Sequence, residues 1–278
     1  MSPSPQNVLG LIAGSGDLPL MVIETCRMTG RLLFVLALQG HADPALVREV
    51  PHAWVRLGAA MYGLELLRRA GVHEVVLTGA IRRPSLWELQ PDKYTMAFLA
   101  NAGIKNLGDG GALKAVIQAL EAEGFRIIGV EDIVEDLVAP LGLYGKCTPD
   151  AQAWADIRHG VEIARGIGAL DIGQGAVVQR GRVLAVEAAE GTDTMLARCR
   201  TLAHQEPGGV LVKVCKPGQE RRADLPTIGT ITLDNAAAAG LRGIALEAGN
   251  TLIIQKRAVI EKANRLGLFI VGIDPEIL

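Results

Sequence analysis

The chain has 278 residues, of which 49% are hydrophobic, 21% charged and 4% aromatic, and its formal net charge is −2 at pH 7. This length allows two domains with separate cores, and the composition is that of a globular protein. The near-neutral charge excludes the basic surface that nucleic-acid binding needs, and the scarcity of aromatic residues argues against stacking on single strands. An anionic ligand is therefore expected at a local site.

The cysteines, histidines and apolar runs predict a cytoplasmic protein. Four scattered cysteines form no C-x-x-C pair, so reduced thiols are expected. The five histidines lack H-x-x-x-H spacing, which disfavours a zinc site. No apolar run approaches the roughly 20 residues of a membrane-spanning helix, and the short polar start, Met1–Gln6, is not expected to be a signal peptide.

The first predicted unit is a strand, a glycine-rich turn and a helix. Val8–Ile12 is apolar, Gly14, Ser15 and Gly16 form the turn, and Leu18–Thr29 has an amphipathic pattern. Backbone N–H groups at such a turn, together with the helix dipole, suit a phosphate. A purely structural turn fits the same residues equally well.

Two positions disfavour a dinucleotide at this turn. Asp17 is expected to cap the helix, but Pro19 stands where the dinucleotide fingerprint needs a third glycine. Gln39 follows the second predicted strand, Leu32–Leu38, where an acid would bind the ribose. A nicotinamide-dependent oxidoreductase is therefore a weak alternative.

A second glycine- and arginine-containing segment, TGAIRRP at Thr78–Pro84, follows the predicted strand Glu74–Leu77. Ligands of open α/β sheets bind at the carboxyl ends of the strands. Its two arginines suit a phosphate or carboxylate, although solvated surface arginines are an equal alternative. The candidate substrate-binding residues here are Thr78, Gly79, Arg82 and Arg83.

Asp109 stands on a glycine-flanked turn before the periodic segment Ala112–Glu123. It fits either a helix N-cap or a metal ligand, and the cap is favoured on sequence alone. The strand–helix alternation breaks around Ala139–Pro149, where prolines and glycines gather. This shift predicts one domain over residues 1–140 and a second α/β domain over residues 141–278.

In the second half, Ala176–Gln179 and Arg182–Val186 predict a hairpin around Arg180 and Gly181. Three acids follow, immediately before a helix predicted at Thr194–Ala203. Hard oxygen ligands of this kind suit Mg²⁺, but acids also stabilise helix N-termini without any metal. The candidate metal ligands here are Glu187, Glu190 and Asp193.

The segment RRADLPTIG, Arg221–Gly229, contains one acid, Asp224, among cations. The predicted buried strand Val210–Val214 carries Lys213 shortly before it. Four cations close to one acid fit a polyphosphate site or a solvated basic loop equally well. The cations are Lys213, Lys216, Arg221 and Arg222, and Thr227 of the same segment is a further candidate for substrate binding.

Five motifs occur together along the chain: LIAGSGDLP, TGAIRRP, VLAVEAAEGTD, KPGQERRADLPTIG and GIALEAGNTLI. In this order they resemble the UDP-2,3-diacylglucosamine pyrophosphatases of the LpxI type, over nearly the whole chain. The resemblance implies an α/β protein with an N-terminal Rossmann-like parallel-sheet domain and a distinct C-terminal α/β domain. It also implies a Mg²⁺-dependent hydrolase of lipid A biosynthesis that yields UMP and 2,3-diacylglucosamine 1-phosphate, forms homodimers and binds lipid between its domains.

The resemblance makes Asp224, in the DLPTIG motif, the expected catalytic residue. We expect Asp224 to hold Mg²⁺ with Glu187, Glu190 or Asp193, or to act as the base, and the sequence leaves both roles open. Lys213, Arg221 and Arg222 would stabilise phosphoryl charge. Contact with the cytoplasmic face of the inner membrane is expected for a lipid substrate. The alternative is a non-catalytic module that binds a nucleotide sugar or lipid.

Overall fold

The structure is a computed structural model, and it describes residues 8–82, 89–101, 109–202 and 208–278. Contacts divide the chain into two compact units. Unit 1 comprises the residues up to Glu135 together with the short segment Glu220–Ala223, and unit 2 comprises Asp136–Gln219 and Asp224–Leu278. The DLPTIG motif therefore begins where the chain passes from unit 1 back into unit 2.

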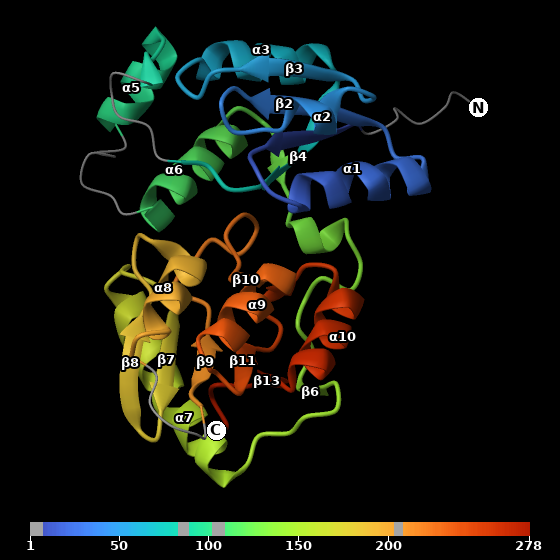
Figure 1. Ribbon diagram of the computed structural model, residues 1–278. Helices are drawn as coiled ribbons and strands as arrows, with labels where there is room; N and C mark the ends of the chain where they lie inside the picture. The colour runs from blue at the N-terminus through green and yellow to red at the C-terminus, as the bar shows by residue number, and fades with distance from the viewer. Residues whose placement is uncertain (1–7, 83–88, 102–108, 203–207) are drawn as a thin grey trace. The chain divides into compact units, whose positions relative to one another are not determined.

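Unit 1 is built on a parallel five-stranded sheet with the order β3-β2-β1-β4-β5 (Figure 1). The strands are β1 (Val8–Ala13), β2 (Leu33–Leu38), β3 (His52–Val55), β4 (Val72–Thr78) and β5 (Arg126–Ile127). The helices are α1 (Leu18–Thr29), α2 (Pro44–Val47), α3 (Ala60–Arg69), α5 (Lys93–Asn101) and α6 (Asp109–Ala122), with a 3-10 turn η2 at Val130–Asp132. The strand order reverses between β1 and β4, which makes this the topological switch point.

Unit 2 contains a mixed six-stranded sheet with the order β6-β13-β11-β9-β7-β8 and a two-stranded sheet, β10-β12. The strands are β6 (Gly142–Tyr144), β7 (Gly175–Gln179), β8 (Arg182–Val186), β9 (Val210–Lys213), β10 (Thr227–Ile228), β11 (Gly243–Glu247), β12 (Leu252–Ile253) and β13 (Phe269–Ile273). The helices are α7 (Ala151–Ala169), α8 (Gly191–Cys199), α9 (Thr230–Ala238) and α10 (Lys256–Leu266). The expected fold class, two distinct α/β domains, is confirmed.

The two faces of the six-stranded sheet bury different sets of side chains. Val210 and Val212 of β9 pack with α7, whereas Leu211 packs with α8, α9 and α10 on the other face. Figure 1 shows α8 beside α9, and α10 beside α9, over this second face. Because side chains alternate along a strand, Lys213 lies on the same face as Leu211. A buried cation is thus placed beneath α8.

The predicted hairpin is confirmed, with β7 and β8 joined by Arg180 and Gly181. Both linking residues have positive φ, 51° and 73°, as a two-residue type I′ turn requires. The buried carboxylate of Asp156 on α7 accepts hydrogen bonds from their backbone N–H groups at 3.0 and 2.7 Å. Helix and turn therefore stabilise each other.

Several element boundaries differ from the sequence-based expectations. Helix α8 begins at Gly191 rather than Thr194, so Asp193 lies in its first turn and Glu190 at its N-cap. The strand expected at Arg126–Val130 ends at Ile127, and Val130 is instead the first residue of η2. Asp17 occupies the N-cap of α1, but its side chain makes no capping hydrogen bond, because its backbone is already helical at φ −83° and ψ −25°.

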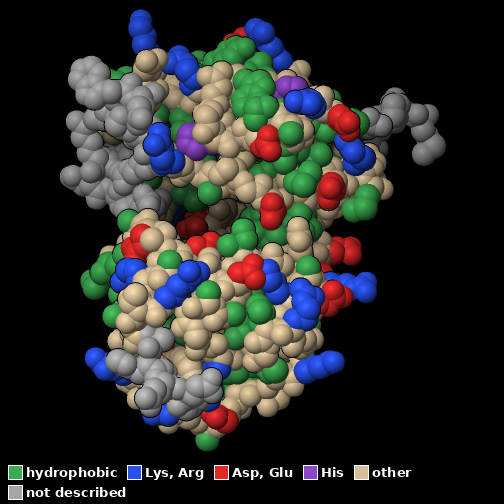
Figure 2. Space-filling view, viewed as in Figure 1, with side chains coloured by type: hydrophobic (Ala, Val, Ile, Leu, Met, Phe, Trp, Pro, Cys, Tyr) green, Lys and Arg blue, Asp and Glu red, His purple; other side chains and the backbone are tan. Residues whose placement is uncertain are grey.

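Surface charge is mixed. On the described part of the face drawn in Figure 2, acidic and basic side chains are interspersed, and neither sign forms a continuous patch. This agrees with the near-zero net charge. A local, partly buried cluster remains the place to expect anion chemistry.

Candidate functional site

The polar cluster of unit 2 lies at one edge of its six-stranded sheet. Strands β8 and β9 each pair antiparallel with β7, and β9 pairs parallel with β11, so β8, β9 and β11 end at the same edge. Glu187 directly follows β8, Lys213 ends β9 and Glu247 ends β11. This is the edge at which α/β sheets bind ligands.

Lys213 is the centre of the cluster. Its side chain is 3% exposed, and its ammonium donates to Thr192 Oγ1 at 2.6 Å and to the Thr227 carbonyl oxygen at 3.4 Å. Glu187 Oε1 lies 3.9 Å away. Burial lowers the pKa of Lys213, while the negative charges of Glu187, Asp193 and Asp224 oppose that shift.

Glu187 is buried and only half satisfied. Its Oε1 accepts a hydrogen bond from Thr192 Oγ1 at 2.7 Å. Its Oε2 has no hydrogen-bond partner among the residues that the structure describes. An unpaired buried carboxylate oxygen is costly unless a donor or cation reaches it. The hydrogen-bonded group therefore has one carboxylate oxygen, Glu187 Oε2, that could accept a cation. Its members are Glu187, Thr192 and Lys213.

Asp224 belongs to the same cluster. It is half-buried, its Oδ2 accepts a hydrogen bond from Gln219 Nε2 at 2.8 Å, and its charge acts on Lys213. The structure thus brings together Asp224, Lys213, Glu187 and Thr227, all of which the sequence suggested.

The other two acids predicted with Glu187 have partners of their own. Asp193 is exposed, accepts a hydrogen bond from Asn235 Nδ2 at 3.0 Å and acts electrostatically on Lys213. Glu190 forms an ion pair with Arg198. A hydrogen bond from its own backbone N–H, together with Arg198, lowers the pKa of Glu190. Glu190 is therefore oriented toward Arg198 by its position at the N-cap of α8.

The two arginines predicted to bind phosphate belong to unit 1. Arg222 donates to both Glu220 and Glu121, and these hydrogen bonds raise its pKa. Arg221 is exposed, and its charge acts on Glu131, whose pKa is raised by burial and lowered by Arg221. Among the described residues of unit 2, Lys213 is the cation buried in the cluster, and phosphate binding by Arg221 and Arg222 stays a prediction.

At the switch point of unit 1, the two candidate turns bond to each other. The backbone N–H groups of Gly14 and Ser15 donate to the carbonyl oxygens of Thr78 and Ala80 at 2.9 and 3.0 Å, and Ala80 N–H donates back to Ser15 at 2.9 Å. These N–H groups are therefore not free to cradle a phosphate. Thr78 Oγ1 is buried and lacks a partner among the described residues. Substrate binding here stays a prediction.

The remaining predicted residues are placed as follows. Gly16 and Gly79 both have φ of +95°, a backbone conformation that favours glycine. Arg82 is exposed, and its carbonyl oxygen lies 3.2 Å from His41 Nε2. Arg83 and the side chain of Asp109 lie outside the described residues, although Asp109 is the first residue of α6.

The carboxylates of the cluster are of a chemistry that suits magnesium. Among the described residues, no group of three or more His, Cys, Asp or Glu side chains converges as a metal cage. Mg²⁺ commonly takes one or two carboxylates and completes its shell with water and substrate phosphates. Oxygens of this chemistry are Glu187 Oε2, which lacks a partner among the described residues, and the carboxylate of Asp224.

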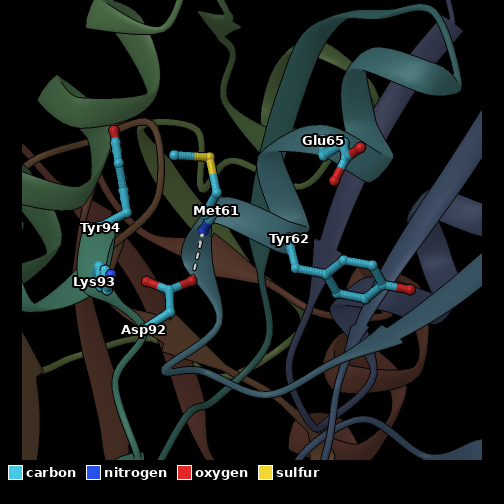
Figure 3. Close-up of a pocket in the computed structure, with 6 residues that line it drawn as sticks. All are labelled: Met61, Tyr62, Glu65, Asp92, Lys93 and Tyr94. Atoms are coloured by element: carbon cyan, nitrogen blue, oxygen red, sulfur yellow. Dashed lines mark hydrogen bonds between the residues drawn. The ribbon is translucent and has the colours of Figure 1, made fainter.

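A separate pocket of about 360 Å³ lies in unit 1 (Figure 3). It is lined by residues at the starts of α3 and α5, where the Asp92 carboxylate accepts a hydrogen bond from Met61 N–H at 3.1 Å. The lining residues are Met61, Tyr62, Glu65, Asp92, Lys93 and Tyr94. None was predicted as a site residue, and their contacts assign them no chemistry.

Sequence reasoning missed Thr192, Gln174 and Gln219 as members of the cluster. Thr192 follows two of the suspected acids, and its position in the first turn of a helix beside a strand end was a usable signal. Gln174 and Gln219 lack such a signal, because amides are common in loops. The sheet topology places Gln174, immediately before β7, at the same edge as Lys213.

Comparison with known proteins finds a family match for each half of the chain. Residues 8–137 match the LpxI N-terminal domain and residues 140–271 match the LpxI C-terminal domain. The chain is 43% identical over 275 residues to a protein of Caulobacter vibrioides named UDP-2,3-diacylglucosamine pyrophosphatase LpxI, covering 96% of this chain and 98% of that protein. Within the described residues, no helix is long and apolar enough to cross a membrane.

Proposed function

The chain belongs to the LpxI family, and from that premise we propose that it hydrolyses the pyrophosphate bond of UDP-2,3-diacylglucosamine in lipid A biosynthesis. The products are UMP and 2,3-diacylglucosamine 1-phosphate, and Mg²⁺ assists the reaction. The near full-length similarity to the Caulobacter vibrioides protein supports the substrate. The observation that carries the chemistry is the buried Lys213 among Thr192, Glu187 and Asp224 at the ligand-binding edge of unit 2.

Each residue of this cluster has a role that its surroundings support. The Lys213 ammonium lies in a water-poor site, where a positive charge stabilises negative charge on phosphoryl oxygens more strongly than it would in water. The Thr192 hydroxyl accepts a hydrogen bond from this ammonium and donates one to Glu187, so it holds both side chains in place. Asp224 accepts the proton of the attacking water or holds the metal.

Magnesium would be held by Asp224 together with Glu187 or Asp193. When bound, it would neutralise phosphate charge and acidify a bound water. Glu187 is the better second ligand on grounds of burial, since its Oε2 lacks a partner among the described residues, whereas Asp193 is exposed and bonds to Asn235. Homodimer formation and contact with the inner membrane stay predictions.

The test is release of UMP from UDP-2,3-diacylglucosamine by the wild type and by Asp224→Ala, with Mg²⁺ and with a chelator. We expect metal-dependent release that falls by about 10³-fold or more in the variant, because a group acting on the transferring phosphoryl is removed. Asp234→Ala is the matched control, since Asp234 forms an ion pair with Lys262 on the surface of unit 2.

Two outcomes contradict parts of this proposal. Full activity of Asp224→Ala would move the chemistry to Glu187 and Asp193. Tight binding of the nucleotide sugar by the wild type, without turnover under any divalent metal, would favour the alternative of a non-catalytic binding module.

A further inference from the structure

We propose that Gln219 is a positioning residue that holds the carboxylate of Asp224 in its working orientation. The side-chain amide of Gln219 accepts a hydrogen bond from Lys216 N–H, in the loop that follows β9, and donates one to the carboxylate of Asp224. The catalytic consequence of this role rests on the proposed function, whereas the positioning itself does not.

The orientation of the Gln219 amide follows from its neighbours. The backbone N–H of Lys216 can only donate, and it lies 2.8 Å from Gln219 Oε1. The thiol of Cys215 donates to the same oxygen at 3.1 Å. Two donors on one side require the carbonyl oxygen there, so the NH₂ group must face the other way. Gln219 is thereby a donor toward Asp224.

Both protons of this NH₂ group have acceptors. One bonds to Asp224 Oδ2 at 2.8 Å and the other to Gln174 Oε1 at 3.1 Å. Gln174 is itself held at the sheet edge, because its backbone carbonyl oxygen accepts a hydrogen bond from the backbone N–H of Val214 at 3.0 Å. Gln174 and Gln219 therefore connect the Asp224 carboxylate to Val214, the residue that follows β9.

The hydrogen bond from Gln219 is important for the orientation of Asp224. Over the described residues, Gln219 is the one hydrogen-bond donor that reaches its carboxylate. The preceding four residues, Glu220–Ala223, belong to unit 1, so Asp224 is the first residue of the chain's return to unit 2. A carboxylate at such a junction needs a contact from unit 2 to keep a fixed place relative to Lys213.

Asp156 offers a contrast inside the same unit. It too accepts a hydrogen bond from a glutamine, Gln152 Nε2, at 3.2 Å. It also accepts the backbone N–H groups of Arg180 and Gly181. Removing Gln152 leaves Asp156 held by two bonds, whereas removing Gln219 leaves Asp224 without a described donor. Gln152 is therefore the matched control.

Two substitutions separate positioning from packing. Gln219→Glu keeps the shape and the acceptor for Lys216, but it replaces the donor with a negative charge beside Asp224. Gln219→Met keeps the length and removes the hydrogen bonds without adding charge. We expect kcat for UMP release to fall about 10- to 100-fold in the Met variant, and further in the Glu variant, with KM changed less than about threefold. Gln152→Glu and Gln152→Met should retain wild-type kcat.

Comparing kcat of Gln219→Met with kcat of Gln219→Glu separates positioning from packing. If Gln219 only fills space, the isosteric Glu variant is the more active of the two, and that result overturns the proposal. Equal kcat in the Gln219 and Gln152 series would overturn it as well.

Crystal structures of the wild type and of Gln219→Met give a readout that needs no turnover. We expect one Asp224 side-chain conformer in the wild type and a displaced or multiple conformer in the variant. An unchanged Asp224 conformer would overturn the positioning role, whatever the activity. Absence of turnover by the wild type, with Asp224 displaced in the variant, would overturn the proposed function and leave the positioning role in place.

Discussion

The two units carry parallel strands that end in polar or glycine-rich turns, but the two edges are used differently. At the switch point of unit 1, the turns after β1 and β4 satisfy each other's backbone groups, and no charged side chain among the described residues of these turns is buried. At the corresponding edge of unit 2, Lys213 and Glu187 are buried with Thr192. Strand ends indicate where ligands can bind. Buried charged side chains then distinguish a candidate site from two turns that only hydrogen-bond to each other.

Among the substitutions that test the contrast between the two edges, that of Lys213 is expected to have the largest effect. Lys213→Met removes the buried ammonium and leaves Glu187 without its counter-charge. We expect UMP release to fall by about 10²–10³-fold, and the free energy of unfolding to fall by about 3 kcal/mol. Enzyme assays and urea titrations measure the two losses. Unchanged activity would remove Lys213 from the site and weaken the contrast between the edges.

Substitution at the glycine turns of unit 1 should affect stability more than chemistry. A Cβ at Gly79 would lie 2.7 Å from Ser15 O, and its φ of +95° adds strain. Gly79→Ala is expected to lower the free energy of unfolding by about 3 kcal/mol.

Gly16→Ala is the control for the glycine prediction. Gly16 has the same φ, but a Cβ there meets nothing within 4 Å, so the smaller loss expected for it measures strain alone. Equal losses in the urea titrations of both variants would show that the close approach of the two turns contributes nothing.

The hydroxyl of Thr192 tests how far the unit 2 cluster acts as one group. Thr192→Val removes the hydroxyl that accepts a hydrogen bond from Lys213 and donates one to Glu187. We expect a loss of about 1–3 kcal/mol in the free energy of unfolding and about a tenfold loss of kcat. Thr192→Ser should restore both, and failure of the Ser variant would indicate that packing of the methyl group matters more.

The smallest effect is expected at the opposite edge of the unit 2 sheet, where Asp150 pairs with Arg242, just before β11. The hydrogen bond from Arg242 lowers the pKa of Asp150 to about 2, from an ordinary value of 3.8. The folded state therefore gains stability above about pH 4, and this gain is lost as the pH falls toward 2.

Asp150→Asn should accordingly be less stable than wild type at neutral pH, and the gap should close between about pH 4 and 2. Thermal unfolding across this pH range measures it. Activity should stay unchanged, since Asp150 lies away from the cluster. A gap that stays constant with pH would show that the ion pair contributes nothing.

Much of the fold could be predicted from local patterns. The hairpin bounds at Arg182–Val186 and the turn at Arg180 and Gly181 follow from apolar alternation and turn chemistry. Helix starts were less accurate. The start of α8 at Gly191 turns Glu190 toward Arg198, although Glu190 and Asp193 looked equivalent in the sequence.

The site could be predicted in part. The resemblance to the LpxI family indicated Asp224, whereas Lys213 and Glu187 were indicated by their charge at the ends of predicted strands. The structure places all three in one cluster. The same reasoning grouped Arg221 and Arg222 with them, because they adjoin Asp224 in sequence. Both arginines belong to unit 1, since the chain enters that unit at Glu220 and leaves it after Ala223, so their part in the site stays a prediction.

From the amino-acid order alone one can infer the α/β class, the family and the residue types capable of phosphate chemistry, because periodicity and motifs are local. The folded structure was needed to show that N–H groups of the Gly14–Gly16 turn donate hydrogen bonds to the turn after β4. It was also needed to show that Gln219 donates to Asp224. These are properties of hydrogen-bond partners distant along the chain. A donor's spacing in the sequence does not reveal whether folding has already supplied its acceptor.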